Sequence, residues 1–163
     1  MGRYDVHFPT PWRLPRHKMG TMEIARAAQV LAERSDHRVL VIVDADDDCA
    51  VDLAARISAA MSPWSGETAV AVREFEAWFL AGLGGLRSHS AVSSSARFDS
   101  DPESPRDAKG RLSQMMTEPY REPLHQARFA SAMDIQEARR TRSFAHLVSC
   151  VERLLVGGST SAQ

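Results

Sequence analysis

The stretch VLVIVDADDDC, Val39 to Cys49, decides the fold class of this chain. Five apolar residues lead directly into four aspartates within five positions. An apolar run without polar alternation predicts a strand that is buried on both faces, as in a parallel sheet. Ligands of open α/β sheets bind beyond the carboxyl ends of the strands. The aspartates therefore stand where a ligand site is expected.

The aspartates predict a divalent-cation site. Packed carboxylates repel one another, and a bound cation removes that cost. Carboxylate oxygens favour Mg²⁺ or Mn²⁺. In an extended segment Asp44 and Asp46 would point the same way and form a two-carboxylate clamp. The predicted metal ligands are Asp44, Asp46 and Asp48. The alternative is a helix cap, with acidic residues at the favourable end of the helix dipole.

A second acidic segment, VREFEAWFL, follows the next apolar run, ETAVAVR. We expect that run to form a second strand, so that its end would lie near the aspartates. Glu76, beside Trp78 and Phe79, would then be a further metal ligand or a general base. The alternative is that Glu74 and Glu76 only occupy the first turn of a helix.

Other acidic motifs can be tested on the same residues. An EF-hand loop beginning at Asp44 would need Gly and Glu where the chain has Cys49 and Ala55. A Walker B strand would need an earlier G-x-x-x-x-G-K-[ST] loop, which the sequence lacks. A haloacid-dehalogenase-like phosphatase shares the apolar strand and D-x-D but usually continues with Thr or Val, not with Asp47 and Asp48. It remains the alternative enzyme.

The remaining pattern predicts helices around these strands. Apolar spacing predicts a helix from Met22 to about Arg34, capped by Thr21, and another over residues 53–61. Further helices are expected over about 107–116, over 123–133, from Asp134 with its D-x-x-E cap, and over 143–155. The order predicts an α/β fold with a parallel sheet and flanking helices, followed by a helical C-terminal portion.

Three segments stand apart from this pattern. Residues 84–106 are rich in Gly, Ser and Pro and are expected to form a long, solvated loop. The sequence YDVHF, residues 4–8, would be a third short strand. Residues 157–163 are expected to be a disordered tail, so residues 1–156 would form a single domain.

Composition narrows the class of protein. The chain has 163 residues, of which 44% are apolar and 25% charged, and a net charge of −1. Two distant cysteines without C-x-x-C spacing favour a reduced, cytoplasmic protein without a zinc site. No apolar run is long enough to span a membrane. The N-terminal residues Arg13, Arg16 and Lys18 would contact a nucleic-acid backbone or form a solvated surface.

Several segments together resemble one bacterial family, domain of unknown function 4276. They are VLVIVDADDDC, VREFEAWFLA, RDAKGRL, Tyr120, HQARF, Asp134 and RSF. That family is regarded as similar to TOPRIM, the metal-binding α/β module of topoisomerases, primases and some nucleases. The resemblance covers about residues 10–156.

The resemblance implies a TOPRIM-like sheet in which Asp44 and Asp46 match the D-x-D. TOPRIM modules also use a glutamate after an earlier strand, and no Glu precedes Glu23 here. The chain therefore resembles a family member shortened by about one strand and one helix. By the same resemblance, Glu76 and Lys109 would be catalytic.

Two readings of the function follow. The first is a Mg²⁺- or Mn²⁺-dependent phosphodiesterase or nuclease, a hydrolase acting on nucleic acid in phage defence, with an ATPase partner implied by the family. Arg73 and the N-terminal basic residues would bind phosphates. The second is a non-catalytic regulatory or interaction subunit that keeps the acidic pocket. Its open sheet edge would accept a strand from a partner or from a second copy.

Overall fold

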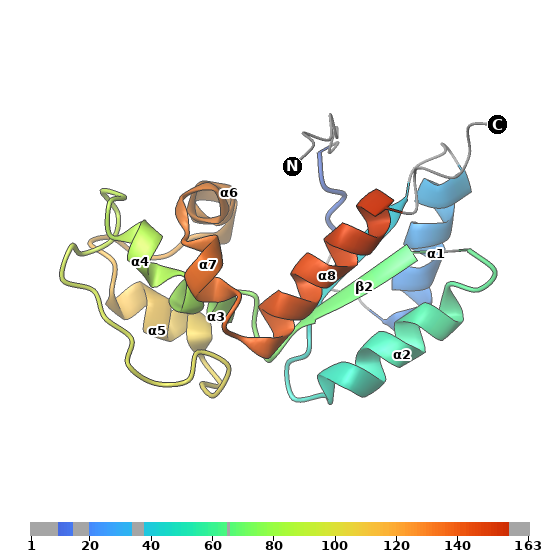
Figure 1. Ribbon diagram of the computed structural model, residues 1–163, viewed down its shortest axis with the longest axis horizontal. Coiled ribbons are helices and arrows are strands. Elements are labelled where there is room, and N and C mark those ends of the chain that lie inside the picture. The colour runs from blue at the N-terminus through green and yellow to red at the C-terminus, as the bar shows by residue number, and fades with distance from the viewer. Residues whose placement is uncertain (1–9, 15–19, 34–37, 65, 157–163) are drawn as a thin grey trace.

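The computed structural model describes residues 10–14, 20–33, 38–64 and 66–156. The helices and strands are ordered along the chain as Figure 1 shows: α1 (Thr21–Glu33), β1 (Val39–Asp44), α2 (Ala50–Ala60), β2 (Gly66–Ala71), α3 (Glu76–Ala81), α4 (Leu83–Leu86), α5 (Ala108–Gln114), α6 (Glu122–Ala132), α7 (Ile135–Ala138) and α8 (Arg142–Val156). The molecule has a half built on the sheet and a half built from α3 to α7. No helix within the described ranges is long and apolar enough to cross a membrane.

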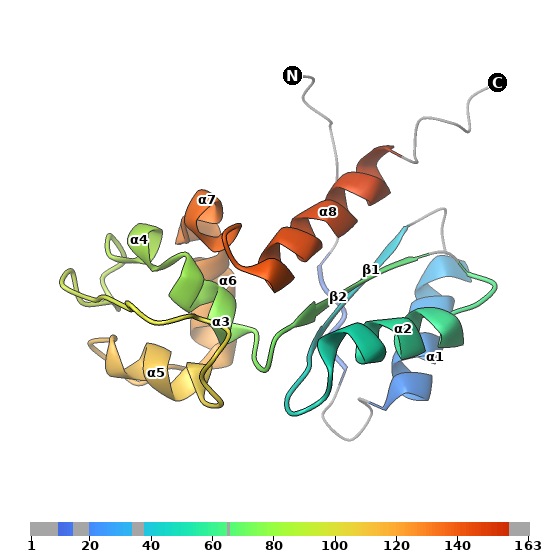
Figure 2. The ribbon, with the colours of Figure 1, turned by 60° about the horizontal axis from the view of Figure 1, so that its bottom comes forward.

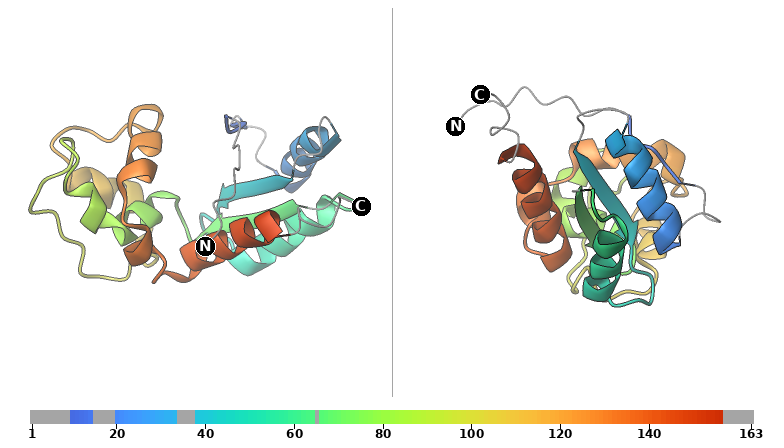
Figure 3. Two further views of the ribbon diagram at one scale, coloured as in Figure 1. Left: turned by 45° about the horizontal axis from the view of Figure 1, so that its top comes forward. Right: turned by 90° about the vertical axis from the view of Figure 1, so that its right-hand side faces the viewer.

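The sheet explains why the acidic segments meet. β1 and β2 pair in parallel, from Val39 opposite Gly66 to Asp44 opposite Ala71. Helix α2 connects them, as a parallel crossover requires. Helices α1 and α2 cover one face of the sheet, and α8 packs over β2 on the other face (Figure 2 and Figure 3, right). The sequence prediction of an α/β fold with a parallel sheet, flanking helices and a helical C-terminal portion is confirmed.

The prediction that β1 is buried on both faces is wrong. Val39, Val41 and Val43 are buried in the core beneath α1 and α2, but Ile42 is 43% exposed. The physical reason is that α8 packs mainly over β2 and leaves the same face of β1 partly uncovered. The third strand predicted at residues 4–8 lies outside the described residues.

The other half has its own core, in which aromatic rings pack edge to face. Phe79 contacts Phe129 with ring centroids 5.7 Å apart, and Trp78 contacts Phe144 at 5.6 Å. All four side chains are at most 5% exposed. Edge-to-face pairs add to the stabilisation from buried area. Phe144 lies on α8, so α8 contributes to this core as well as covering β2.

Residues 84–106 are not the solvated insertion that their composition suggested. The segment begins inside α4, and Ala91, Val92 and Ala96 are at most 6% exposed. Val92 forms an isolated antiparallel bridge with Met116. Small and apolar residues within the Ser-rich stretch therefore attach it to the helical core. Composition alone did not show this, because burial of a few residues has no periodic signal.

Most predicted helices are confirmed, with differences at their ends. Thr21 is the first residue of α1, and the preceding Gly20 supplies the carbonyl that accepts from the backbone N–H of Ile24. Asp134 caps α7 as predicted, by accepting from two backbone N–H groups at 2.8 and 3.1 Å. The Glu137 carboxylate accepts instead from the N–H of Gly84, so the reciprocal half of the capping box is replaced by a contact to α4.

Candidate functional site

Both strands end side by side in an unusual backbone conformation. Asp46 has φ 49° and Arg73 has φ 65°, and the N–H of Asp46 donates to the carbonyl of Arg73 at 2.9 Å. The left-handed region is sparsely populated by residues other than Gly, although Asp tolerates it better than most. The prediction that the chain stays extended from Asp44 to Asp46 is therefore wrong, because the backbone turns at Asp46. Strained non-glycine residues of this kind cluster at functional sites.

Asp44 ends β1 and is the most perturbed carboxylate in this region. One of its oxygens accepts from the backbone N–H of Phe75 at 2.8 Å. Burial raises the pKa of Asp44 from 3.8 to about 6, and the nearby charges of Glu76, Asp46 and Glu74 add to the rise. The structure thus brings the acidic ends of the two strands together, as the parallel pairing predicted. Ionisation of Asp44 is therefore unfavourable, because the charged form is partly removed from water and is repelled by the neighbouring carboxylates.

Glu76, the first residue of α3, is more deeply buried than the aspartates. Its side chain is 2% exposed, and burial raises its pKa. Within the described part of the chain, neither its Oε1 atom nor the hydroxyl of Tyr120 has a hydrogen-bond partner of ordinary geometry. The two groups are nevertheless close, since Glu76 contributes to the raised pKa of Tyr120. A buried acceptor without a partner costs about 1–3 kcal/mol.

Lys109 brings a positive charge to this acidic group. Its ammonium forms an ion pair with Glu122. Burial opposes its charge, but Glu122 and the more distant Glu76 outweigh burial and raise the pKa of Lys109. The backbone N–H of Lys109 donates to the Glu74 carboxylate at 2.9 Å, which fastens the start of α5 to the end of β2. Sequence analysis named Glu76 and Lys109 together, and the structure places them together.

The two later aspartates of the run lie in a different environment. Asp47 forms ion pairs with Arg106 at 3.0 Å and with Arg73 at 3.4 Å. Asp48 forms an ion pair with Arg56 of α2 at 2.7 Å. Both carboxylates are exposed. Of the three predicted metal ligands, Asp44 is close enough to Glu76 and to the exposed Asp46 for their charges to raise its pKa, whereas Asp48 is directed to an arginine.

No set of three or more His, Cys, Asp or Glu side chains in the described ranges has the arrangement of a complete metal cage. Mg²⁺ rarely uses such cages, since it is usually bound through one or two carboxylates together with waters and substrate phosphates. Asp44 and Glu76 offer two carboxylates from the ends of neighbouring strands, and one oxygen of Glu76 lacks a partner. Two carboxylates are the number of protein ligands that such a magnesium site uses, so the metal prediction for Asp44 depends on water and phosphate supplying the remaining ligands.

The predicted basic residues are scattered. Arg13 hydrogen-bonds to Gln126 of α6, and Arg73 pairs with Asp47. Arg16 and Lys18 lie outside the described residues. His125, which could have been a base, is 1% exposed, and its Nδ1 atom accepts from the N–H of Arg121 at 2.9 Å. Its ring therefore packs against Phe129 and accepts a hydrogen bond at the start of α6.

Sequence analysis assigned no role to two residues at this site. Tyr120 lies beside Glu76, and Arg106, at the end of the irregular segment, reaches Asp47. Tyr120 was among the residues that carried the family resemblance, which is the only signal that could have drawn attention to it. Nothing in the local pattern around Arg106 predicts its partner.

Comparison with protein families identifies what the chain is related to. The model of a domain of unknown function, DUF4276, matches residues 13–152. The chain belongs to this family. The match covers both strand ends, the helical half and most of α8, so the acidic site lies wholly within the family domain. Comparisons with curated proteins and with solved structures give no match.

Proposed function

We propose that this DUF4276 protein is a Mg²⁺- or Mn²⁺-dependent phosphodiesterase that acts on nucleic acid. The observation that carries the proposal is the pair formed by Asp44 and Glu76. Asp44, partly buried at the end of β1, and Glu76, buried at the start of α3, both have raised pKa values, and Oε1 of Glu76 lacks a hydrogen-bond partner of ordinary geometry among the described residues. A structural role explains such a pair poorly, since each buried charge destabilises the fold.

The residues around the pair suit the chemistry of a phosphodiester. Asp44 and Glu76 would hold the cation, and Asp46 adds negative charge beside them. Bound there, the cation would polarise a phosphate and activate water. Lys109, oriented by Glu122, places its charge near Glu76 and would meet the phosphate. Arg73 lies at the same strand end, and its pairing partner Asp47 is exposed.

The family resemblance extends this proposal to a biological setting. A role in phage defence, together with an ATPase partner, follows from the resemblance and is part of the proposal. The haloacid-dehalogenase-like phosphatase remains an alternative use of Asp44 and Asp46, with a phosphate monoester in place of the diester.

Calorimetric titration of Mn²⁺ into metal-free protein tests the site directly. The parent is compared with Asp44→Asn/Asp46→Asn and with Asp47→Asn/Asp48→Asn, a control that removes the same charge from the same turn. We expect binding in the parent and in the control, and none in the first double variant. Equal loss in both would indicate general attraction to a negative surface and contradict the site. A parent that binds no Mn²⁺ would remove the basis of the phosphodiesterase.

A nuclease assay then tests the activity. Supercoiled plasmid and single-stranded DNA and RNA are incubated with Mn²⁺ and the parent or Glu76→Gln. We expect cleavage by the parent and a rate lower by about a hundredfold or more for the variant, because Glu76→Gln removes one of the two carboxylates that would hold the cation. Cation binding without cleavage of any substrate would favour the alternative function, a non-catalytic regulatory or interaction subunit.

One observation supports that second reading, an interaction subunit. Ile42 is 43% exposed on the face of β1 that α8 leaves partly uncovered. Among the described residues β1 pairs only with β2, so a partner or a second copy could add a strand to the other edge of β1 and pack apolar side chains against the face at Ile42. Sedimentation velocity of the parent and of Ile42→Glu tests the homo-oligomeric case. A dimer that the substitution dissociates would support the interaction subunit, and a monomeric parent would oppose that case.

A further inference from the structure

A second polar cavity lies at the far end of α3 from the acidic site. It has a volume of about 620 Å³ and is bounded by the end of α3, by α4, by residues 97–103 and by the junction of α7 and α8. Its volume falls within the range of small-molecule sites, which is roughly 300–1,000 Å³. Four of its lining residues are arginines: Arg87, Arg97, Arg140 and Arg142.

Within the part of the chain that the structure describes, no ion pair joins the guanidinium groups of these four arginines to a carboxylate. Every ion pair of the described residues is formed by other cations, such as Arg56, Arg106 and Arg153. Four acidic residues also line the cavity, but three of them accept hydrogen bonds from the backbone. Glu103 accepts from the N–H of Ser143 at 2.9 Å.

The other two carboxylates are held in the same way. Glu137 accepts from the N–H of Gly84 at 2.9 Å, and Asp101 accepts from the N–H of Glu103 at 3.0 Å. Asp99 is the remaining acid. The carboxylates thus order the walls of the cavity, while the planar donors of the four arginines stay available. Arginine donors of this kind match the geometry of phosphate oxygens in a bidentate manner.

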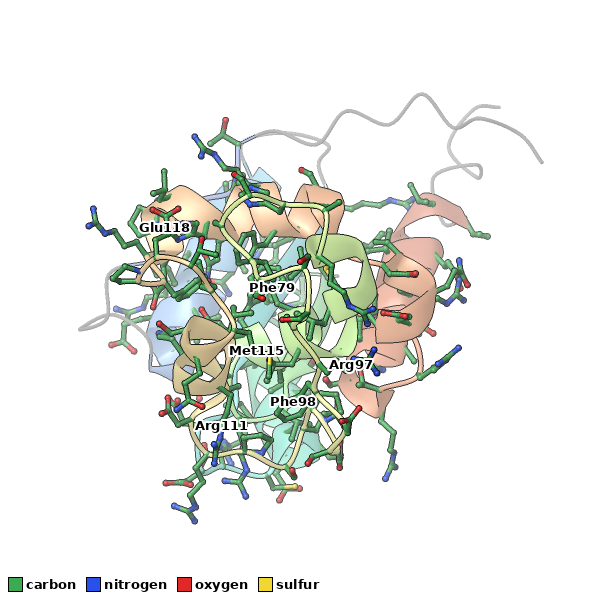
Figure 4. All side chains as sticks on the ribbon, turned by 90° about the vertical axis from the view of Figure 1, so that its left-hand side faces the viewer. Phe79, Arg97, Phe98, Arg111, Met115 and Glu118 are labelled. Carbon is green, nitrogen blue, oxygen red and sulfur yellow. The ribbon has the colours of Figure 1, made fainter. Side chains whose placement is uncertain are left out.

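An aromatic side chain stands among these cations. Phe98 lines the cavity and is half-buried against the helical core. Figure 4 shows Arg97 and Phe98 next to each other on the irregular segment. Aromatic rings beside arginines give a surface on which a nucleobase can stack. Phosphate-binding cations and a ring in a cavity of this size are the two components of a nucleotide site.

We propose that this cavity binds a phosphate-bearing nucleotide, as a free nucleoside phosphate or as a unit of a single strand. The four arginines would contact the phosphates, and Phe98 would contact the base. This inference goes beyond the proposed phosphodiesterase and does not need the cation site, because none of the cavity residues belongs to the acidic group. The proposal would hold even if the protein had no hydrolytic activity.

Fluorescence anisotropy in the presence of EDTA tests the proposal. The probes are a labelled ATP and a labelled thymidine oligonucleotide, each titrated with the full chain. Arg97→Ala/Arg140→Ala is compared with Arg111→Ala/Arg128→Ala, which removes the same charge from exposed positions on α5 and α6 outside the cavity. Figure 4 shows Arg111 on α5, apart from Arg97 and Phe98. Thermal unfolding confirms that each variant is folded.

We expect at least one probe to bind, with an affinity that falls as salt rises. The cavity variant should weaken binding about tenfold, because it removes two of the four charges that would contact phosphate. The control should change it less than about twofold. Phe98→Ala should weaken binding of the probe without changing its salt dependence, which separates the ring from the charges. The probe that binds identifies the source of the nucleotide.

Two results would overturn the proposal. Neither probe binds, or the cavity and control variants weaken binding equally, which would mean that only overall charge matters. Because EDTA removes divalent cations, these outcomes are independent of the Mn²⁺ titration. Failure of this cavity and failure of the phosphodiesterase site are therefore distinguishable.

Discussion

Asp44 and Asp48 belong to one run of aspartates, yet they have opposite environments. Asp44 is partly buried, the charges that act most strongly on it are those of the carboxylates Glu76, Asp46 and Glu74, and its pKa is raised to about 6. Asp48 is exposed and forms an ion pair with Arg56 at 2.7 Å. The turn at Asp46 separates them, because it leads the backbone from the strand end to the surface. The comparison teaches that the strand end, rather than the density of acidic residues, marks the site.

The two environments also have opposite effects on the stability of the fold. An exposed ion pair stabilises a protein by at most about 1 kcal/mol, and its loss is correspondingly small. A buried carboxylate without a cation destabilises the fold at the pH where it ionises. Proteins keep such groups where function requires them, at the expense of stability. The two environments therefore predict opposite responses to the same substitution, Asp to Asn.

Asp44→Asn should have the largest effect and should stabilise the metal-free protein. A pKa of about 6 against 3.8 corresponds to about 3 kcal/mol at pH 8, since each pKa unit is about 1.4 kcal/mol. Asn can still accept the N–H of Phe75 through its Oδ1 atom. Urea unfolding at pH 8 in EDTA measures the change. A destabilised variant would show that the Asp44 carboxylate makes favourable interactions in the fold, which would contradict its contrast with Asp48.

The second prediction concerns pH. Folded Asp44 keeps its proton up to about pH 6, whereas the unfolded chain releases it near pH 3.8. The folded state therefore binds more protons between these values, and this group's contribution to stability falls as the pH rises from about 4 to above 6. The stability difference between Asp44→Asn and the parent should grow over that range and level off at higher pH. Unfolding curves of both proteins at several pH values measure it.

Mn²⁺ should reverse the order of the two proteins at pH 8. A ligand that binds only the folded state stabilises it, by about 4.1 kcal/mol at a thousand times its Kd, which exceeds the advantage of about 3 kcal/mol expected for metal-free Asp44→Asn. The parent should gain this stabilisation and Asp44→Asn should not. Thermal unfolding with and without Mn²⁺ compares them. If both gain equally, the cation binds elsewhere.

Glu76→Gln should also stabilise the metal-free protein, by about 1–2 kcal/mol. It removes a buried charge, and its amide can donate to the hydroxyl of Tyr120, whose present contact with the Glu76 carboxylate lacks ordinary hydrogen-bond geometry. Equilibrium unfolding at pH 8 measures this effect, with Tyr120→Phe as the matched control. If Glu76→Gln is destabilising, Glu76 has a structural role that the burial of its charge does not reveal.

Asp48→Asn should have the smallest effect, below about 0.5 kcal/mol in either direction. Its ion pair with Arg56 is exposed to solvent, and salt screens such pairs. Unfolding at low and at high salt measures the difference between the variant and the parent. If the stability changed as much as in Asp44→Asn, the charges of all four aspartates would act together, and the end of β1 would not be distinct from the rest of the segment.

The sequence predicted the parts of the fold that depend on local pattern. The apolar run before Asp44 gave the strand, and Asp134 gave the helix cap, because each signal lies within a few residues. The exposure of Ile42 was not predictable, since it depends on where α8 packs. Likewise, the proximity of Asp44 to Glu76 followed from the parallel pairing, whereas the influence of Tyr120 and Lys109 on the pKa of Glu76 comes from segments distant in the sequence. Long-range packing has no local signature.

Helix α8 has a consequence for how the chain reaches its native state. It covers β2, and its first turn joins the helical core through Phe144 and through the hydrogen bond from Trp78 to Ser143 at 2.7 Å. Near its C-terminal end, the same helix is joined to β2 by two hydrogen bonds from the Arg153 guanidinium to the Glu67 carboxylate. Both ends of α8 therefore contact segments that lie far away in the sequence. During synthesis on the ribosome, neither half can complete its packing until α8 emerges. Such non-local closure slows folding. The β2 surface beneath α8 is therefore the part of the nascent chain in greatest need of protection by chaperones.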